Sequence, residues 1–236
     1  CGTTPEYIEG LAEIAAKFGG TEDSAKPSEE KKTLQVCSGN TVVTVDHVTV
    51  IGERINPTGK KRLKQALLDE DFDYILSQAI EQIDAGAEIL DVNVGVPSLD
   101  DVKMLPLVIK KLQSITGLPL QIDSGNPEAI EAALRVYNGK AIVNSVNGEE
   151  KVMENILPLV KKYGAAVVGL TLDENGISNK AEDRFAIAKR ILERALEYGI
   201  PRENVIIDCL TLTASAQQKE VVETLKAVRM VKEQMG

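Results

Sequence analysis

The chain contains 236 residues, of which 43% are hydrophobic, and this length suits a single sizeable α/β core. Its 27 Lys and Arg residues stand against 36 Asp and Glu residues, which gives a formal net charge of −9. This balance argues against nucleic acid or an anionic membrane as a partner. The aromatic content of 3% also argues against a platform for stacking bases. No apolar run reaches the ~20 residues that a membrane-spanning helix needs.

The beginning of the chain predicts a single helix over residues 1–20. A Thr-Pro-Glu start, apolar residues at helical spacing and a Gly-Gly end are typical of helix boundaries. One short helix cannot form a core, so we expect it to be the end of a preceding domain. The absence of an initiator Met agrees with a start inside a larger protein. Three widely separated Cys residues and no secretion signal indicate a reducing, cytoplasmic setting.

Residues 21–46 are expected to form a linker, because their first part is rich in Glu, Lys and Ser. Residues 47–236 then show a regular rhythm of short β-branched runs and amphipathic helices. The predicted strands cover residues 48–55, 88–94, 120–123, 141–146, 165–172 and 205–210. The predicted helices cover residues 72–85, 101–115, 127–137, 149–163, 181–198 and 218–235.

Six successive βα units predict a parallel sheet, which fits either a (β/α) barrel or an open doubly wound sheet. No G-x-G-x-x-G follows the first strand, which argues against a dinucleotide fold. Polar residues gather at the carboxyl ends of the strands, where barrel active sites are built. We therefore expect a TIM-type (β/α)8 barrel of which the chain supplies about six units.

The strand ends carry acids and amides in nearly every unit. Because the carboxyl ends of parallel strands meet at one mouth, these side chains would bring several negative charges close together. Such crowding requires a ligand, a metal or an Arg to offset it. The residues that close the strands are Glu53, Asn56, Asp91, Asn93, Asp123, Asn144 and Asp208.

Carboxylates accept hydrogen bonds, while Asn both donates and accepts them. Together they suit a heterocycle with a ring N–H beside an amino group and a neighbouring carbonyl. A phosphate ligand is disfavoured, because the strand ends lack a Gly-rich loop and are poor in Lys and Arg. Magnesium, held by the acids, stays open as the weaker alternative.

Three segments resemble the pterin-binding domain shared by dihydropteroate synthases and methyltetrahydrofolate methyltransferases. They are IGERINPTG at residues 51–59, DVNVG at residues 91–95 and IDS at residues 122–124. The segment NSVNG at residues 144–148 fits the methyltransferase branch best. The first six residues, CGTTPE, resemble the end of a zinc-dependent homocysteine-binding barrel. A homocysteine domain followed by a folate domain is the layout of the cobalamin-dependent methionine synthase family.

This resemblance implies binding of 5-methyltetrahydrofolate and presentation of its N5 methyl group to cob(I)alamin, within methionine synthesis from homocysteine. It implies that Asp123, Asn144 and Asp208 bond the pterin ring, and that the remaining strand-end residues line the same mouth. Cys1 would be a zinc ligand only in the intact parent protein. No Asp-x-His-x-x-Gly segment is present, so the corrinoid is expected on a separate domain or protein. No residue is assigned as the catalytic acid.

Two departures from the family pattern limit these implications. The family has a further Asn after its seventh strand, which this chain does not reach, and Cys209 stands where many relatives have Pro. Three alternatives stay open: a methyltetrahydrofolate–corrinoid protein methyltransferase of another pathway, a dihydropteroate synthase, and a non-catalytic folate-binding or scaffolding module. With six of eight strands the chain would leave strand edges unpaired, so the fragment alone is expected to be inactive.

Overall fold

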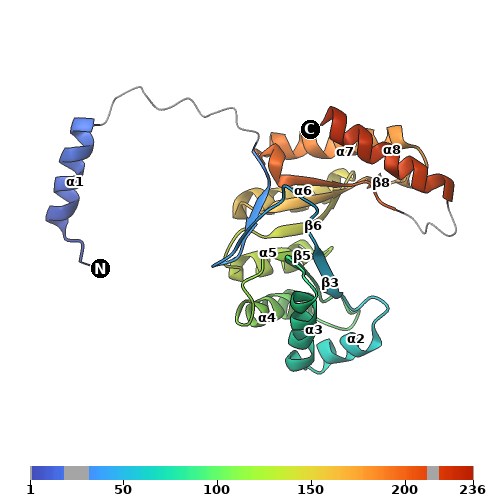
Figure 1. Cartoon of the computed structure of the whole chain (residues 1–236), viewed down its shortest axis with the longest axis horizontal. Coiled ribbons are helices and arrows are strands. Elements are labelled where there is room, and N and C mark those ends of the chain that lie inside the picture. Colours follow the sequence, from blue (N-terminus) through green and yellow to red (C-terminus); the bar gives the residue numbers. More distant parts are fainter. Residues whose placement is uncertain (1, 19–31, 212–217, 236) are drawn as a thin grey trace. The chain divides into compact units, whose positions relative to one another are not determined.

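The computed structural model describes residues 2–18, 32–211 and 218–235, in two compact units, Cys1–Lys32 and Thr33–Gly236 (Figure 1). The described part of the first unit is the helix α1 (Pro5–Phe18), which carries the acid Glu6 in its first turn. Ile8, Leu11 and Ile14 of its apolar stripe are exposed within this unit. The predicted helix is therefore present, and its apolar face is left without a core of its own.

The second unit is built on a six-stranded parallel sheet in which each strand lies beside the one before it in the sequence. An open doubly wound sheet would reverse its strand order at a switch point, whereas a barrel keeps sequence order. The observed order is that of a barrel wall, with β3 and β10 at its two edges. The strands are β3 (Ile51–Ile55), β4 (Ile89–Asn93), β5 (Leu120–Asp123), β6 (Ile142–Asn147), β7 (Ala166–Leu170) and β10 (Val205–Asp208).

Helices follow the strands and cover the sheet, and their ends carry the signals expected from the sequence (Figure 1). The side chains of Asp71, Asp100 and Asn126 accept hydrogen bonds from backbone N–H groups at the starts of three helices. Gly164 ends another helix in the left-handed conformation. The helices are α2 (Lys61–Leu68), α3 (Phe72–Asp84), α4 (Asp101–Gln113), α5 (Pro127–Val136), α6 (Glu150–Tyr163), α7 (Ala181–Glu197) and α8 (Gln218–Gln234).

The two faces of the sheet bury different sets of side chains. On the outer face, residues such as Leu90, Ile122 and Val143 belong to the large cluster that includes the helices. On the inner face, Ile89 and Ile142 belong to a second apolar cluster near the amino ends of the strands. Side chains alternate along a strand, so the next inward positions after Ile89 and Ile142 are Asp91 and Asn144, and both are polar.

A short antiparallel hairpin, β1 (Gln35–Cys37) and β2 (Val42–Thr44), covers the amino ends of the strands. Leu34 and Val36 pack into the inner cluster. The backbone of Cys37 forms an isolated antiparallel β-bridge with that of Lys140. This hairpin falls within residues 21–46, in the second compact unit.

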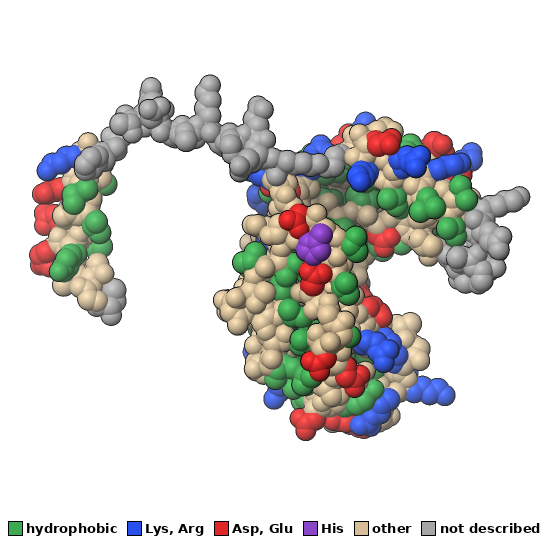
Figure 2. Space-filling view, in the orientation of Figure 1, with side chains coloured by type: hydrophobic (Ala, Val, Ile, Leu, Met, Phe, Trp, Pro, Cys, Tyr) green, Lys and Arg blue, Asp and Glu red, His purple; other side chains and the backbone are tan. Residues whose placement is uncertain are grey.

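Like the β1–β2 hairpin, several further elements of the second unit were not anticipated from the sequence. Helix α2 occupies residues that had no predicted structure, and a two-residue hairpin, β8 (Leu172–Asp173) and β9 (Gly176–Ile177), follows β7. A 3-10 turn, η1 (Arg202–Asn204), precedes β10. None of the described helices is long and apolar enough to cross a membrane. Figure 2 shows the single His of the chain at the surface, where His47 bonds Asp46 and Glu88.

Candidate functional site

Three neighbouring strands bring three of the predicted site residues into one row. The strand register sets Asn93 of β4 opposite Asp123 of β5, and Asp123 opposite Asn144 of β6. The Nδ2 group of Asn93 donates a hydrogen bond to Oδ2 of Asp123 over 2.9 Å. All three side chains are half-buried at the carboxyl ends of their strands. The row therefore offers a carboxylate between two amides, all within reach of one small ring.

Asp91 lies one inward position below this row and is 2% exposed. The Nε2 group of Gln121, on the neighbouring strand, donates to Oδ1 of Asp91 over 2.6 Å. Burial, with smaller contributions from the charges of Asp123 and Glu53, raises the pKa of Asp91 to about 7, although hydrogen bonds from Gln121 and Asn144 act in the opposite direction. Asp91 is therefore partly protonated near neutral pH.

Burial also raises the pKa of Asp123, and the charge of Glu53 adds to this effect while the hydrogen bond from Asn93 opposes it. The described part of the mouth thus holds carboxyl groups whose ionised forms are destabilised. A ligand that presents N–H donors would stabilise the ionised forms and restore lower pKa values. Such a ligand matches the edge of a heterocycle with a ring N–H and an amino group.

Glu53 and Asn56 lie at the carboxyl end of β3, outside the hydrogen-bonded row. Glu53 is exposed and forms an ion pair with Lys60 over 3.2 Å. The side chain of Asn56 accepts a hydrogen bond from the backbone N–H of Thr58, which fixes the following loop. The register of β3 with β4 shifts between Gly52 and Ile55, so Glu53 occupies an irregular stretch of strand.

A buried glutamine stabilises this irregular stretch. Oε1 of Gln82, from α3, accepts the backbone N–H of Arg54 over 2.6 Å. A Cβ atom at position 52 would lie 2.6 Å from the same oxygen, so Gly52 provides the space for it. Gln82 was not singled out in the sequence because its role depends on the packing of α3 against β3.

Asp208 ends β10 and is exposed, with β7 between its strand and the row. Its Oδ1 atom accepts the backbone N–H of Leu210 over 2.7 Å, and Leu210 has a φ of 54°. Fully buried Arg184 of α7 holds this turn by donating to the carbonyl oxygens of Cys209 and Leu210. The structure thus places Asp208 at the same end of the sheet, two strands away from Asn144.

Besides Gln82, sequence reasoning missed the buried polar residues Arg184 and Gln121 near these strand ends. A signal was available for Gln121, because it is a polar residue at an inward position of the apolar strand β5. For Arg184 there was none, since its partners come from the loop before α7, the turn after β10 and α8.

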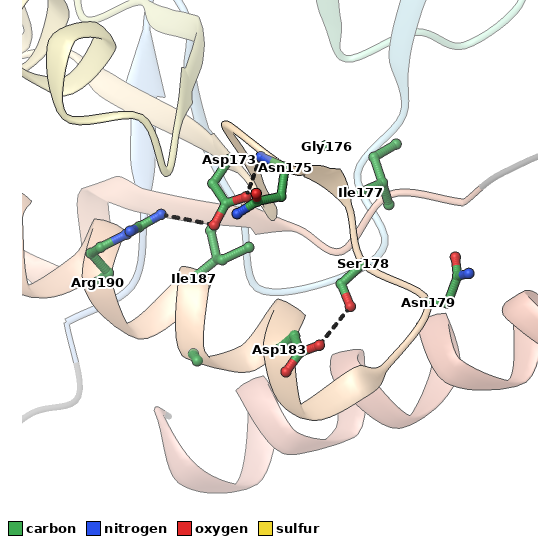
Figure 3. A pocket seen from close by; sticks show the side chains of 10 residues that line it. Asp173, Asn175, Gly176, Ile177, Ser178, Asn179, Asp183, Ile187 and Arg190 are labelled. Atoms are coloured by element: carbon green, nitrogen blue, oxygen red, sulfur yellow. Dashed lines mark hydrogen bonds and ion pairs between the residues drawn. The ribbon is translucent and has the colours of Figure 1, made fainter.

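Separate from the row, residues of the β8–β9 hairpin and of the start of α7 line a hollow of about 650 Å³ (Figure 3). Its polar groups largely satisfy one another. Arg190 lies 3.4 Å from Asp173, and the hydroxyl of Ser178 donates to Asp183 over 2.7 Å. Among the described residues, no hydrogen bond links this hollow to the row on β4, β5 and β6.

Magnesium, the weaker alternative, would need a cluster of acidic side chains. Across residues 2–18, 32–211 and 218–235, no group of three or more His, Cys, Asp or Glu side chains is arranged to hold a metal ion. Cys1, the predicted zinc ligand of the parent protein, lies outside the described residues. Cys209 is buried, and burial raises the pKa of its thiol, which disfavours the nucleophilic thiolate form.

Comparison with known proteins agrees with this geometry. Residues 52–236 match the family described as pterin binding enzyme. The chain is 31% identical to the methionine synthase of Mycobacterium leprae (strain TN) over 248 residues, covering 98% of this chain and 20% of the relative. The methionine synthase of Mycobacterium tuberculosis (strain ATCC 25618 / H37Rv) is also 31% identical, over 242 residues with the same coverage. The chain thus spans about a fifth of the length of these relatives.

Solved structures with the same fold include dihydropteroate synthases. The enzyme of Xanthomonas albilineans with 4-aminobenzoic acid gives a TM-score of 0.65 at 19% identity, over 85% of this chain and 74% of that one. The enzyme of Thermus thermophilus gives 0.63 at 21% identity, over 84% and 74%. At this identity the likeness establishes the fold, and it confirms the predicted barrel, here represented by six βα units. The family match shows that this chain belongs to the pterin binding enzymes, and its sequence resembles the pterin-binding part of methionine synthases.

Proposed function

We propose that this chain binds 5-methyltetrahydrofolate and presents its N5 methyl group for transfer to cob(I)alamin, as one step in methionine synthesis from homocysteine. The observation that carries the proposal is the row of Asn93, Asp123 and Asn144 at the strand ends of a pterin-binding barrel. The alignment with methionine synthases covers 98% of the chain, whereas the pterin binding family matches residues 52–236. The similarity to methionine synthases thus includes most of the residues before the barrel, and this supports a methylfolate as the pterin ligand.

In this proposal Asp123 accepts hydrogen bonds from the ring N–H and amino group of the pterin, and Asn144 bonds the adjoining polar edge. Asp208 contributes from the other side of the mouth. Glu53, Asn56, Asp91 and Asn93 line the site and hold its loops. These contacts would orient the N5 methyl group toward the acceptor.

Cobalamin, bound to another domain or protein, supplies the nucleophile that receives the methyl group. When the C–N5 bond breaks, its electrons stay on N5, so this nitrogen must gain a proton or a hydrogen bond to become a good leaving group. We assign no single residue as the proton donor. Zinc, with Cys1 among its ligands, would belong to the preceding homocysteine domain of the intact protein, and the cytoplasmic setting stays a prediction.

The runner-up is a methyltetrahydrofolate–corrinoid protein methyltransferase without a homocysteine domain, and a non-catalytic folate-binding module is the third reading. The alignment with methionine synthase covers 98% of the chain and so includes most of the residues that precede the barrel, which favours the methionine synthase layout over the runner-up. Transfer of the methyl group to cob(I)alamin, followed by the change in corrinoid absorbance, distinguishes an enzyme from a binding module.

The first test is calorimetry with 5-methyltetrahydrofolate on the intact polypeptide that contains this chain. We expect Asp123→Ala and Asn144→Ala each to weaken binding about 30-fold, because each removes a hydrogen bond in a desolvated site. The control is Asp84→Ala, an exposed carboxylate at the end of α3, which should leave the affinity unchanged. Unchanged affinity in both site variants would refute the proposed pterin site.

A further inference from the structure

A hollow of about 330 Å³ lies beside the mouth, between the loops that follow β3 and β4. Residues 57–61 and Lys64 of α2 line one side, and residues 95–97 line the other. We call it the lysine hollow, because Lys60, Lys61 and Lys64 all line it and no acidic residue does. This is an unusual surface in a chain with a net charge of −9.

The three lysines differ in how their charge is used. Lys60 donates to the carboxylate of Glu53 over 3.2 Å and to its backbone carbonyl over 3.0 Å, so it is partly neutralised. Lys61 and Lys64 are exposed, and in the described part of the chain neither forms an ion pair. Two uncompensated positive charges on one small hollow favour an anionic ligand.

Two of the predicted site residues hold the loops that line the lysine hollow, and one of them belongs to the row. Asn56 accepts the backbone N–H of Thr58 and so pins the loop on one side of the hollow. Asn93 accepts the backbone N–H of Gly95 over 2.7 Å and pins the loop on the other side. The amide of the same Asn93 donates to Asp123. A ligand seated on the row therefore has the hollow directly beside the side chains that hold it.

We propose that the lysine hollow binds the γ-linked glutamate tail of the folate, and that Lys61 and Lys64 make this chain selective for folates with several glutamates. The proposal rests on the proposed function, since it concerns the same ligand. Each added glutamate carries one more carboxylate, and a Lys ammonium on a flexible stem recognises it as a point charge. The row would then bind the pterin ring, and the lysine hollow would bind the tail with an affinity that increases with the number of glutamates.

The test compares 5-methyltetrahydrofolate bearing one glutamate with the same folate bearing three, by calorimetry on the intact polypeptide. We expect the triglutamate to bind about tenfold more tightly, which is the sum expected from two or three exposed ion pairs. Lys61→Gln/Lys64→Gln should reduce this ratio to about two. Lys110→Gln/Lys111→Gln removes the same charge near the carboxyl end of α4 and should keep the ratio unchanged.

The outcomes separate the two proposals. If the monoglutamate binds and the wild-type ratio is one, the tail site is refuted while the pterin site stands. If both double variants reduce the ratio equally, the effect is general charge and the tail site is again refuted. If neither folate binds, the proposed function fails and the tail site fails with it. A ratio that also falls as salt rises from low to physiological concentration would add support, because exposed charges are screened.

Discussion

The inner face of the barrel wall has two levels that differ sharply although the same strands build both. At the lower level Ile89 and Ile142 pack with Leu34 and Val36 of the amino-terminal segment, and all four are nearly inaccessible. On β4 the next inward positions after Ile89 are Asp91 and then Asn93, and on β6 the next one after Ile142 is Asn144, in register with Asp123 of β5. A shift of two residues along a strand therefore separates a dry core from a polar mouth. In this fold stability is concentrated below and ligand binding above.

The two levels also differ in how completely their groups are satisfied. The lower level is apolar and is closed by the β1–β2 hairpin. At the upper level, burial opposes the ionisation of Asp91 and Asp123. The buried carboxyl groups at the mouth therefore lower the stability of the unliganded chain, and a ligand that stabilises their ionised forms would increase it. Three predictions test this contrast, in addition to those on ligand binding.

The largest expected effect concerns Asp91, whose pKa rises from about 3.9 in the unfolded chain to about 7 in the folded one. Below about pH 3 the carboxyl is protonated in both states. Between these two pKa values the unfolded chain releases a proton that the folded chain keeps, so the free energy of unfolding falls by about 4 kcal/mol from about pH 4 to pH 7 and then levels off. About 3 kcal/mol of this loss lies above pH 5. Asp91→Asn should remove this loss, and urea denaturation at pH 5 and pH 8 measures it.

The control for this prediction is Asp84→Asn, which replaces an exposed carboxylate and should keep the wild-type dependence on pH. Some dependence should persist in Asp91→Asn, because the pKa of Asp123 is raised as well. If wild type and Asp91→Asn lost equal stability between pH 5 and pH 8, ionisation of Asp91 would not be the cause.

At the lower level, Ile142→Ala should cost about 3 kcal/mol, because it removes a fully buried side chain and leaves a cavity. Ile142→Val should cost about 1 kcal/mol at the same site. Thermal or urea unfolding measures both, and calorimetry measures the folate affinity of the folded variants. We expect affinity to change less than threefold, since the row lies above the cavity. A loss of affinity as large as that of Asp123→Ala would contradict the separation of the two levels.

The smallest effect concerns the attachment of the amino-terminal hairpin. Tyr137 donates its hydroxyl proton to the carbonyl of Cys37 over 2.8 Å and accepts the buried backbone N–H of Leu120 over 3.1 Å. Tyr137→Phe leaves both groups without this partner, and we expect a loss of about 2 kcal/mol. Tyr163→Phe is the matched control, because its hydroxyl bonds Glu131 at the surface and should cost about 0.5 kcal/mol or less. Equal midpoints for the two variants in urea would contradict the prediction.

Much of the fold was predictable because it depends on local patterns. The six strands of the parallel sheet and helices α3 to α8 correspond to the predicted ranges, with boundaries differing by a few residues. Helix α2 was missed because eight residues with three buried positions give too short a periodic pattern. The β1–β2 and β8–β9 hairpins were missed because strands of two or three residues show no readable alternation.

The candidate site was predicted as a set, and its internal arrangement was not. The sequence placed seven polar residues at the strand ends, and the structure places all seven at that end of the sheet. It brings Asn93, Asp123 and Asn144 into one row, leaves Glu53 paired with Lys60, and sets Asp208 two strands away. Their role in binding the pterin stays a prediction.

The sequence by itself determined the alternation of strands and helices and the polar character of the strand ends, because periodicity and caps are properties of neighbouring residues. Strand register, the burial of Asp91 beside Gln121, and the meeting of two loops at the lysine hollow were decided only by the tertiary structure. Each of these joins residues from different βα units. Distances and desolvation between such residues exist only once the units pack together, and these quantities set the pKa values and the shape of the site.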